Sequence, residues 1–217
     1  QRGLEAGTRD WTGRPGARYW QLRTDYSIDT RLDPVTGTVS GREMVTITNP
    51  SDSALKELAI RLDQNLFAPN TARPSPSEAI TGGVTVSRMR ANGREINVDS
   101  LRERWSTTTL VRVKLDTPIP AGGTGTLEVS WAFKVPVIPA GQRGDRMGAW
   151  TNRLFQLAQW YPRVANYDDL RGWDQDPYMG NSEFYNNFGS FDVRIDVPAG
   201  WLVGATGVLM NSAEVLT

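Results

Sequence analysis

Apolar and polar residues alternate along most of this chain. The clearest run covers residues 20–32, where every second residue is apolar, aromatic or threonine: Trp20, Leu22, Thr24, Tyr26, Ile28, Thr30 and Leu32. A period of two is typical of a β-strand with one buried face. Residues 33–37, Asp-Pro-Val-Thr-Gly, have the composition of a turn, and the alternation then resumes through Val39, Val45 and Ile47. The sequence therefore predicts a long β-hairpin at the start of the chain.

Further segments show the same alternation, at residues 58–62, 84–90, 94–98, 111–115, 127–135 and 191–197. Asn92-Gly93 separates two of them, and this dipeptide is a strong hairpin signal because both residues readily take positive φ. We expect a last strand over residues 201–209, and only residues 152–160 allow a short helix. Many strands with short turns predict an all-β fold, a twisted β-sandwich or saddle of mostly antiparallel sheets.

The first 17 residues lack any such period. They mix Gly, Arg and Thr around Trp11, which indicates an extended N-terminal arm. The remaining residues, 18–217, are expected to form a single β-sandwich or saddle domain, because a chain of 217 residues with 39% hydrophobic residues can bury one large core.

Composition excludes several kinds of function. Lys+Arg and Asp+Glu number 24 each, and no long basic block is present, so we expect no nucleic-acid partner. The chain has no cysteine and no histidine, which removes disulfides, thiolate nucleophiles and imidazole ligands. No apolar run approaches the roughly 20 residues that span a bilayer. No signal-peptide pattern opens the chain, so we expect either a cytosolic protein or one whose Gln1 follows a cleavage.

The distal part of the chain carries distinctive motifs. They are Leu-Phe-Gln-Leu-Ala-Gln-Trp-Tyr-Pro-Arg at 154–163, Gly-Trp at 172–173, Glu-Phe-Tyr at 183–185, Phe-Asp-Val at 191–193 and Ala-Thr-Gly at 205–207. Together with the first hairpin, they resemble the N-terminal domain of the aminopeptidase N family of zinc metallopeptidases (gluzincins), in particular a bacterial subgroup. The resemblance spans roughly residues 18–210.

The resemblance implies a non-catalytic β-saddle that packs against a separate zinc-peptidase domain. In that family the second domain carries His-Glu-x-x-His, because zinc needs imidazole and carboxylate ligands on one helix face. Neither this motif nor the family's Gly-x-Met-x-Asn motif occurs here. We therefore expect no catalytic residue, no enzymatic activity and no cofactor in this chain.

Three functions remain open. The first is a structural or accessory subunit or domain that packs on a protein partner in a larger assembly, membrane-associated assemblies included. The second is the N-terminal part of a zinc aminopeptidase that shapes the substrate entrance, and the third is a carbohydrate- or peptide-binding β-sandwich. The resemblance implies a periplasmic, extracellular or cell-surface location.

Candidate site residues follow partly from the resemblance. In the family, this domain lends a Gln or Glu to the α-amino group of the substrate, and Gln156 or Gln159 fits that place; the alternative is that both bond to backbone. An aromatic cluster predicts either an interface or core filling: Trp160, Tyr161, Tyr167, Trp173, Tyr178, Phe184 and Tyr185. Asp174 and Asp176 are weak Ca²⁺ candidates, and the alternative is ion pairing with Arg163 or Arg171.

Overall fold

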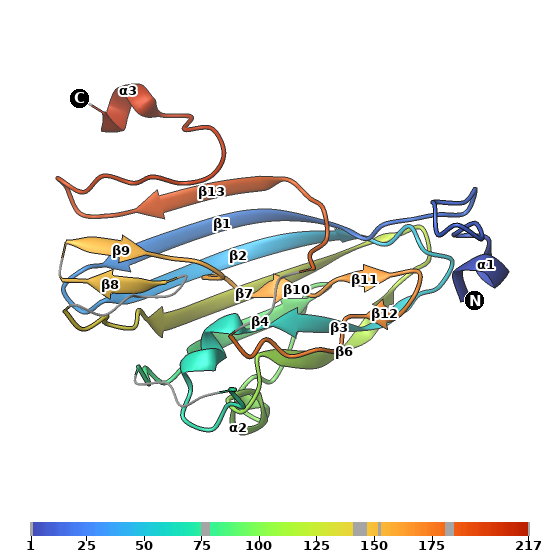
Figure 1. Cartoon of the computed structure of the whole chain (residues 1–217), viewed down its shortest axis with the longest axis horizontal. Helices are drawn as coiled ribbons and strands as arrows, with labels where there is room; N and C mark the ends of the chain where they lie inside the picture. Colours follow the sequence, from blue (N-terminus) through green and yellow to red (C-terminus); the bar gives the residue numbers. More distant parts are fainter. Residues whose placement is uncertain (1, 75–78, 141–146, 152, 181–184, 217) are drawn as a thin grey trace.

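The predicted N-terminal hairpin lies within a six-stranded sheet. The structure, a computed structural model, describes residues 2–74, 79–140, 147–151, 153–180 and 185–216. β1 (Arg23–Asp33) and β2 (Thr38–Thr48) pair antiparallel along their whole length. The sheet has the order β13-β1-β2-β7-β4-β5, with β4 (Val84–Ala91), β5 (Arg94–Glu95), β7 (Thr124–Lys134) and β13 (Phe191–Asp196), as Figure 1 shows. β13 runs parallel to β1, whereas the other neighbours are antiparallel.

A smaller sheet packs against the first. Its order is β10-β3-β6, formed by β3 (Leu55–Arg61), β6 (Leu110–Ile119) and β10 (Arg163–Val164). Two further strand pairs are β8 (Gly148–Trp150) with β9 (Leu154–Gln156) and β11 (Tyr167–Asp168) with β12 (Gly172–Trp173). The helices of the described residues are short: α1 (Arg2–Ala6), the 3-10 helix η1 (Asp63–Phe67), α2 (Arg102–Trp105) and α3 (Ser212–Val215).

One hydrophobic core lies between the two main sheets. Alternate residues of β1, β2 and β7 are buried, among them Ile28, Val45 and Val129. They share a cluster with Leu58 and Ile60 of β3 and with residues of β6. The all-β sandwich predicted from the alternation is thus confirmed.

The N-terminal segment is folded and does not form an extended arm, so the conformation predicted for it is wrong. Residues 2–6 form α1, and the chain then folds back so that Gly16 N–H donates to the carbonyl of Thr8 at 2.8 Å. Thr8 and Arg9 both bond to the Asp169 carboxylate, Thr8 Oγ1 at 2.6 Å and Arg9 Nη2 at 2.8 Å. A five-residue helix is too short to show a period, and the bond from Arg9, just after the helix, reaches a residue 160 positions away in the sequence. The domain boundary at residue 18 stays a prediction.

Two expectations near the other end of the chain are also wrong. Leu154–Gln156 form β9 and no helix, after a turn in which Thr151 has φ 60°. Residues 201–209 form no strand, because Gly204 and Gly207 interrupt the alternation and Gly207 takes φ 99°. No helix in the described part of the chain is long and apolar enough to cross a bilayer.

Candidate functional site

The C-terminal end of β3 is buried on both faces. The segment that carries the distal motifs contacts this end of the strand. Leu58 to Arg61 are all buried, although an exposed strand face would alternate. Residues 158–178 cover the outer face: β10 pairs with β3 through Arg163 opposite Arg61, and Ala165 N–H donates to the carbonyl of Ala59 at 2.8 Å. The covering loops are therefore fixed to β3 by backbone hydrogen bonds.

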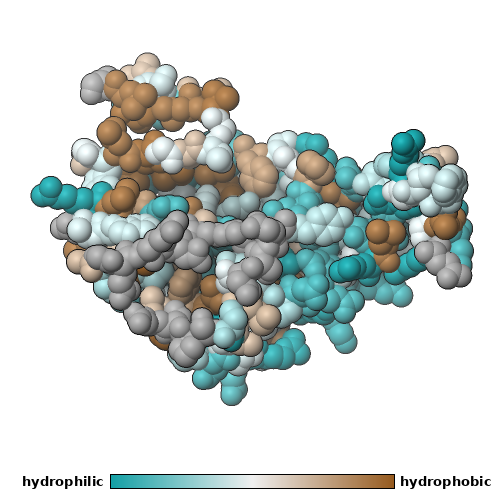
Figure 2. All heavy atoms as spheres, viewed as in Figure 1, coloured by the Kyte–Doolittle hydropathy of each residue, from teal (hydrophilic) through white to brown (hydrophobic). Residues whose placement is uncertain are grey.

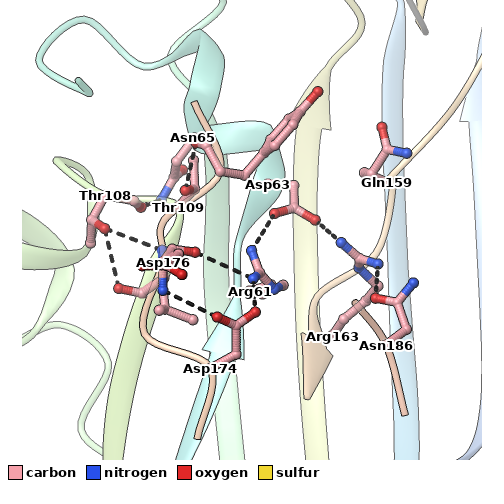
Figure 3. Close-up of polar contacts among 12 residues, drawn as sticks. Arg61, Asp63, Asn65, Thr108, Thr109, Gln159, Arg163, Asp174, Asp176 and Asn186 are labelled. Carbon is pink, nitrogen blue, oxygen red and sulfur yellow. Dashed lines mark hydrogen bonds and ion pairs between the residues drawn. The ribbon is translucent and has the colours of Figure 1, made fainter. Parts of the chain in front are cut away.

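Four charged side chains form a buried network under these loops (Figure 3). Arg163 of β10 bonds to the carboxylate of Asp63 in η1 and donates from Nη1 to Asn186 Oδ1 at 2.6 Å. Arg61 bonds to Asp174 and lies 4.0 Å from Asp63 Oδ1. We call Arg61, Asp63, Arg163 and Asp174 the ion network.

The two positive and two negative charges of the ion network balance, and its side chains are largely buried. The side chains of Arg61 and Asp63 are 7% and 1% exposed. Burial raises the pKa of the Asp63 carboxyl, and the positive charges of Arg163 and Arg61 oppose that rise. A guanidinium stays protonated and donates several hydrogen bonds, so the ion network can hold these segments together.

The two acidic metal candidates take part in ion pairs. Asp174 pairs with Arg61, and Asp176 Oδ2 lies 3.9 Å from Arg171 Nη1. Within the residues that the structure describes, no group of three Asp, Glu, His or Cys side chains gathers as a metal site would require. Asp176 thus lies near Arg171, one of the two arginines expected from the sequence, whereas Asp174 pairs with Arg61.

Gln159 sits in a strained turn that the ion network flanks. Its φ is 48°, which side chains with a Cβ rarely adopt. Gln64 of η1 fixes the turn, because its Nε2 donates to the carbonyl of Gln159 at 2.9 Å and to that of Ala158 at 3.2 Å. No interaction joins the Gln159 side chain to the other labelled residues in Figure 3. The backbone of Gln159 is therefore held by Gln64, and the residue is half-buried.

Gln156, the other glutamine candidate, is placed differently. It lies at the end of β9 and is exposed, opposite Gly148 of β8. The structure therefore distinguishes the two glutamines, since only Gln159 lies in a turn with strained backbone. A substrate role for either one stays a prediction.

Most of the aromatic candidates pack inside the fold. Trp160 and Tyr161 are half-buried. The ring of Trp160 lies 5.8 Å from that of Trp131, and the ring of Tyr161 lies 5.5 Å from that of Tyr26. Burial raises the pKa of Tyr161 to about 12. Tyr167 lies between Trp20 and Trp173, at 5.4 and 4.8 Å. Trp173 and Tyr178 are buried, Tyr185 is 54% exposed, and Phe184 lies outside the described residues.

The sequence analysis missed a buried carboxyl group, Glu43 of β2. It lies on the core side with Val45, and burial raises its pKa well above the ordinary range. Neither carboxyl oxygen has a hydrogen-bond partner among the described residues. The sequence could have predicted its burial, because Glu43 lies an even number of residues from Val39, Val45 and Ile47 and therefore on the same face of the strand.

An uncovered apolar surface lies at the edge of the main sheet. Phe191, Val193 and Ile195 of β13 lie opposite the buried residues of β1 and so point to the core side of the sheet, yet they are 52%, 38% and 38% exposed. The following segment adds Leu202, Val203, Val208, Leu209 and Met210, which are 44–89% exposed. We call these eight residues the β13 surface; Figure 2 shows apolar side chains gathered over β13 and the C-terminal segment.

Comparison with known proteins finds similar folds and no family model. No protein-family model and no curated protein matches this chain. M1 zinc metallopeptidases are among the solved structures similar to it. One is a mutant from Deinococcus radiodurans bound to a Tyr-Ser-Ala substrate, with 18% identity and a TM-score of 0.49; the match covers 90% of this chain and 37% of that one. The sequence motifs resemble this same group of enzymes.

Two more structures give comparable values. The M1 zinc metallopeptidase from Deinococcus radiodurans has 18% identity and a TM-score of 0.43, with 89% of this chain and 36% of that chain covered. A two-domain M1 zinc metallopeptidase mutant bound to L-tryptophan has 21% identity and a TM-score of 0.44, with 86% and 35% covered. This chain thus spans 35–37% of the length of the three structures.

Proposed function

We propose that this chain is a non-catalytic β module that docks on a zinc-peptidase domain through the β13 surface. The observation that carries the proposal is the row of apolar side chains on β13 that lies on the core side of the sheet and is nevertheless 38–52% exposed. Contiguous exposed apolar surface marks interaction sites in soluble proteins. The motif resemblance supports a peptidase domain as the partner.

The same proposal gives Gln159 a role. A module fixed at the β13 surface would present the Gln159 turn toward the substrate entrance of its partner. A side-chain amide on a rigid backbone can accept a hydrogen bond from the α-amino group of a peptide substrate. The strained φ of 48° supports this role, because strained residues gather at binding sites.

A binding experiment tests the docking. The 217-residue chain is mixed with the catalytic domain of an M1 zinc metallopeptidase from the same genome, and the affinity is measured by calorimetry. Val193→Ser combined with Ile195→Ser should weaken binding at least tenfold, because these side chains leave the interface core. Asp192→Ser combined with Arg194→Ser changes the opposite face of the same strand and should leave the affinity unchanged. Equal effects of both pairs would contradict the proposal.

The reading frame beyond Thr217 separates two forms of this function. A downstream His-Glu-x-x-His places module and peptidase in one polypeptide, and the module then shapes the entrance of an aminopeptidase. A stop codon there favours an accessory subunit that binds its peptidase in trans. We propose a periplasmic or cell-surface location for either form, which fractionation of the source cells tests directly.

A further inference from the structure

β13 forms one edge of the main sheet, as Figure 1 shows. Within the described residues, β1 is the one strand that pairs with it. This pairing runs from Phe191 to Asp196 without a register shift, and the strand contains neither proline nor lysine. Lysine, proline and bulges are common means by which sheet edges avoid association. The edge of β13 lacks all three.

The backbone groups of alternate residues point away from β1. Tyr26 N–H donates to the carbonyl of Ser190 at 2.8 Å, so Ser190 turns its backbone toward β1. Successive residues of a strand turn their backbone groups to opposite sides, so Asp192 and Arg194 also bond to β1. The other set of N–H and C=O groups lies on the free edge and forms no hydrogen bond within the described part of the chain; it belongs to Phe191, Val193 and Ile195.

The segment that follows β13 does not pair with this edge. Trp201 N–H donates to the carbonyl of Pro198 at 3.3 Å, which closes a turn directly after the strand. The ring of Trp201 lies 5.6 Å from that of Phe155 in β9, and Phe155 packs against the core. The described residues 202–216 form no backbone hydrogen bond with β13.

The sequence of β13 is complementary to itself when two copies run antiparallel. With Val193 opposite Val193 of the second copy, Phe191 lies opposite Ile195. In the same register, Asp192 lies opposite Arg194. Directly opposite residues share a face of the sheet, and both apolar pairs and pairs of opposite charge stabilise it. Apolar side chains therefore meet on one face and opposite charges on the other.

The same register fits the backbone, and its neighbours do not fit the charges. The three apolar residues all face the free edge, and such opposite residues exchange two hydrogen bonds in an antiparallel pair. A register centred on Arg194 would set its guanidinium against the same group of the second copy and Asp192 against Asp196. A register centred on Ile195 would run past the end of the strand at Asp196.

We propose that two copies of this chain associate through antiparallel pairing of their β13 strands, centred on Val193, so that the two main sheets form one continuous sheet. The inference goes beyond the proposed docking and does not depend on it, because the pairing uses the backbone edge of β13 whereas docking uses the side chains of one face. A contact through one strand is small, so we expect half of the chains to be dimeric at roughly 10–100 µM.

Sedimentation velocity of the full chain alone, from about 5 to about 500 µM, tests the pairing. Asp192→Arg sets basic side chains against each other twice in the dimer, so self-association should weaken about tenfold or more. Arg194→Asp should act in the same way through acidic side chains. An equimolar mixture of the two variants restores opposite charges at both places, and it should form a mixed dimer about as tightly as the parent chain.

Arg42→Asp is the matched control. Arg42 of β2 lies 3.0 Å from Asp29, and Arg194 of β13 lies 3.8 Å from the same carboxylate. The control therefore removes a comparable surface ion pair but lies away from the edge, and it should leave self-association unchanged.

Val193→Pro provides a test that does not involve charge. It removes an N–H that points away from β1, so circular dichroism should show a folded chain while the dimer is lost. A chain that stays monomeric up to about 500 µM would overturn the proposal. So would charge variants that associate no better when mixed than alone, or a dimer that Val193→Pro and Asp192→Arg leave intact. Amides of β13 that become protected only when a peptidase domain is added would assign the edge to the peptidase and exclude self-pairing.

Discussion

Glu43 carries a carboxyl group into the core, where neither oxygen has a hydrogen-bond partner among the described residues. Its ordinary pKa is 4.5, and burial raises the value in the folded chain. Above pH 4.5 the unfolded chain loses this proton while the folded chain keeps it. The folded state then binds more protons than the unfolded state, so Glu43 makes the free energy of unfolding fall as the pH rises through the window between the two pKa values.

Glu43→Gln should remove this pH dependence. A neutral amide of the same shape cannot ionise, so the variant should gain stability relative to the parent chain as the pH rises from 5 to 8. Urea unfolding at both pH values measures the difference, and subtraction cancels the other titrating groups. Glu5→Gln serves as an exposed control. A constant difference between Glu43→Gln and the parent at pH 5 and 8 would refute the assignment of a neutral buried carboxyl.

Gln159 offers a second test at a single residue. Its φ of 48° costs about 1–2 kcal/mol for a residue with a Cβ. Gln159→Gly should therefore raise the free energy of unfolding by up to about 1 kcal/mol, after the greater freedom of glycine in the unfolded chain is deducted. Gln159→Ala keeps the strained Cβ and should stay close to the parent. If urea unfolding shows the same change for both variants, the strain is not located at this turn.

Among the elements, the ion network connects β3 and η1 to β10. Arg163→Met leaves Asp63 buried without its bonded guanidinium, and the free energy of unfolding should fall by about 3–5 kcal/mol. Arg171→Met is the matched control, because its pair with Asp176 is 3.9 Å long and largely exposed, and it should change stability by less than about 0.5 kcal/mol.

Chemical denaturation of both arginine variants provides the measurement. The loss in Arg163→Met should shrink as the pH is lowered, because a protonated Asp63 no longer needs a cation. Similar losses for the two variants would mean that the buried network is no stronger than a surface ion pair.

The sequence predicts strands well where their pattern is local. Residues 20–32 and 38–48 carry their own alternation and their own turn, so β1 and β2 follow from neighbouring residues. The parallel pairing of β13 with β1 joins Tyr26 to Phe191, and no local period encodes a partner so far away. For the same reason the N-terminal segment, whose Thr8 and Arg9 bond to Asp169, was expected to be an extended arm.

The candidate site was only partly predictable. The motif at 154–163 directed attention to Gln159 and to the aromatic residues, but the bond between Arg163 and Asp63 crosses 100 positions. Charged residues in loops show no period, so their burial can be recognised only from the assembled fold.

For the molecule as a whole, the core and the β13 surface differ in what covers them. β2 and β7 lie at the centre of the main sheet, and every second residue of each faces the shared core. All six residues of β13 are exposed, and the segment after it places apolar side chains in solvent. Among the described residues, the core face at the centre of the main sheet is therefore buried, whereas the β13 edge is exposed to solvent. A partner that covered this edge would gain about 25 cal/mol of binding free energy for each Å² of apolar area buried.

Hydrogen exchange followed by mass spectrometry should separate these two regions. In the isolated chain, amides of β2 and β7 should exchange only through global unfolding, whereas amides of residues 198–216 should exchange within seconds because few of them form hydrogen bonds. Addition of the zinc-peptidase domain should slow exchange in β13 and residues 198–216 and leave α1, at the far end of the molecule in Figure 1, unchanged. Protection that spread evenly over the chain would indicate general stabilisation, and protection confined to other strands would place the peptidase elsewhere; either result would exclude the β13 surface as the docking site.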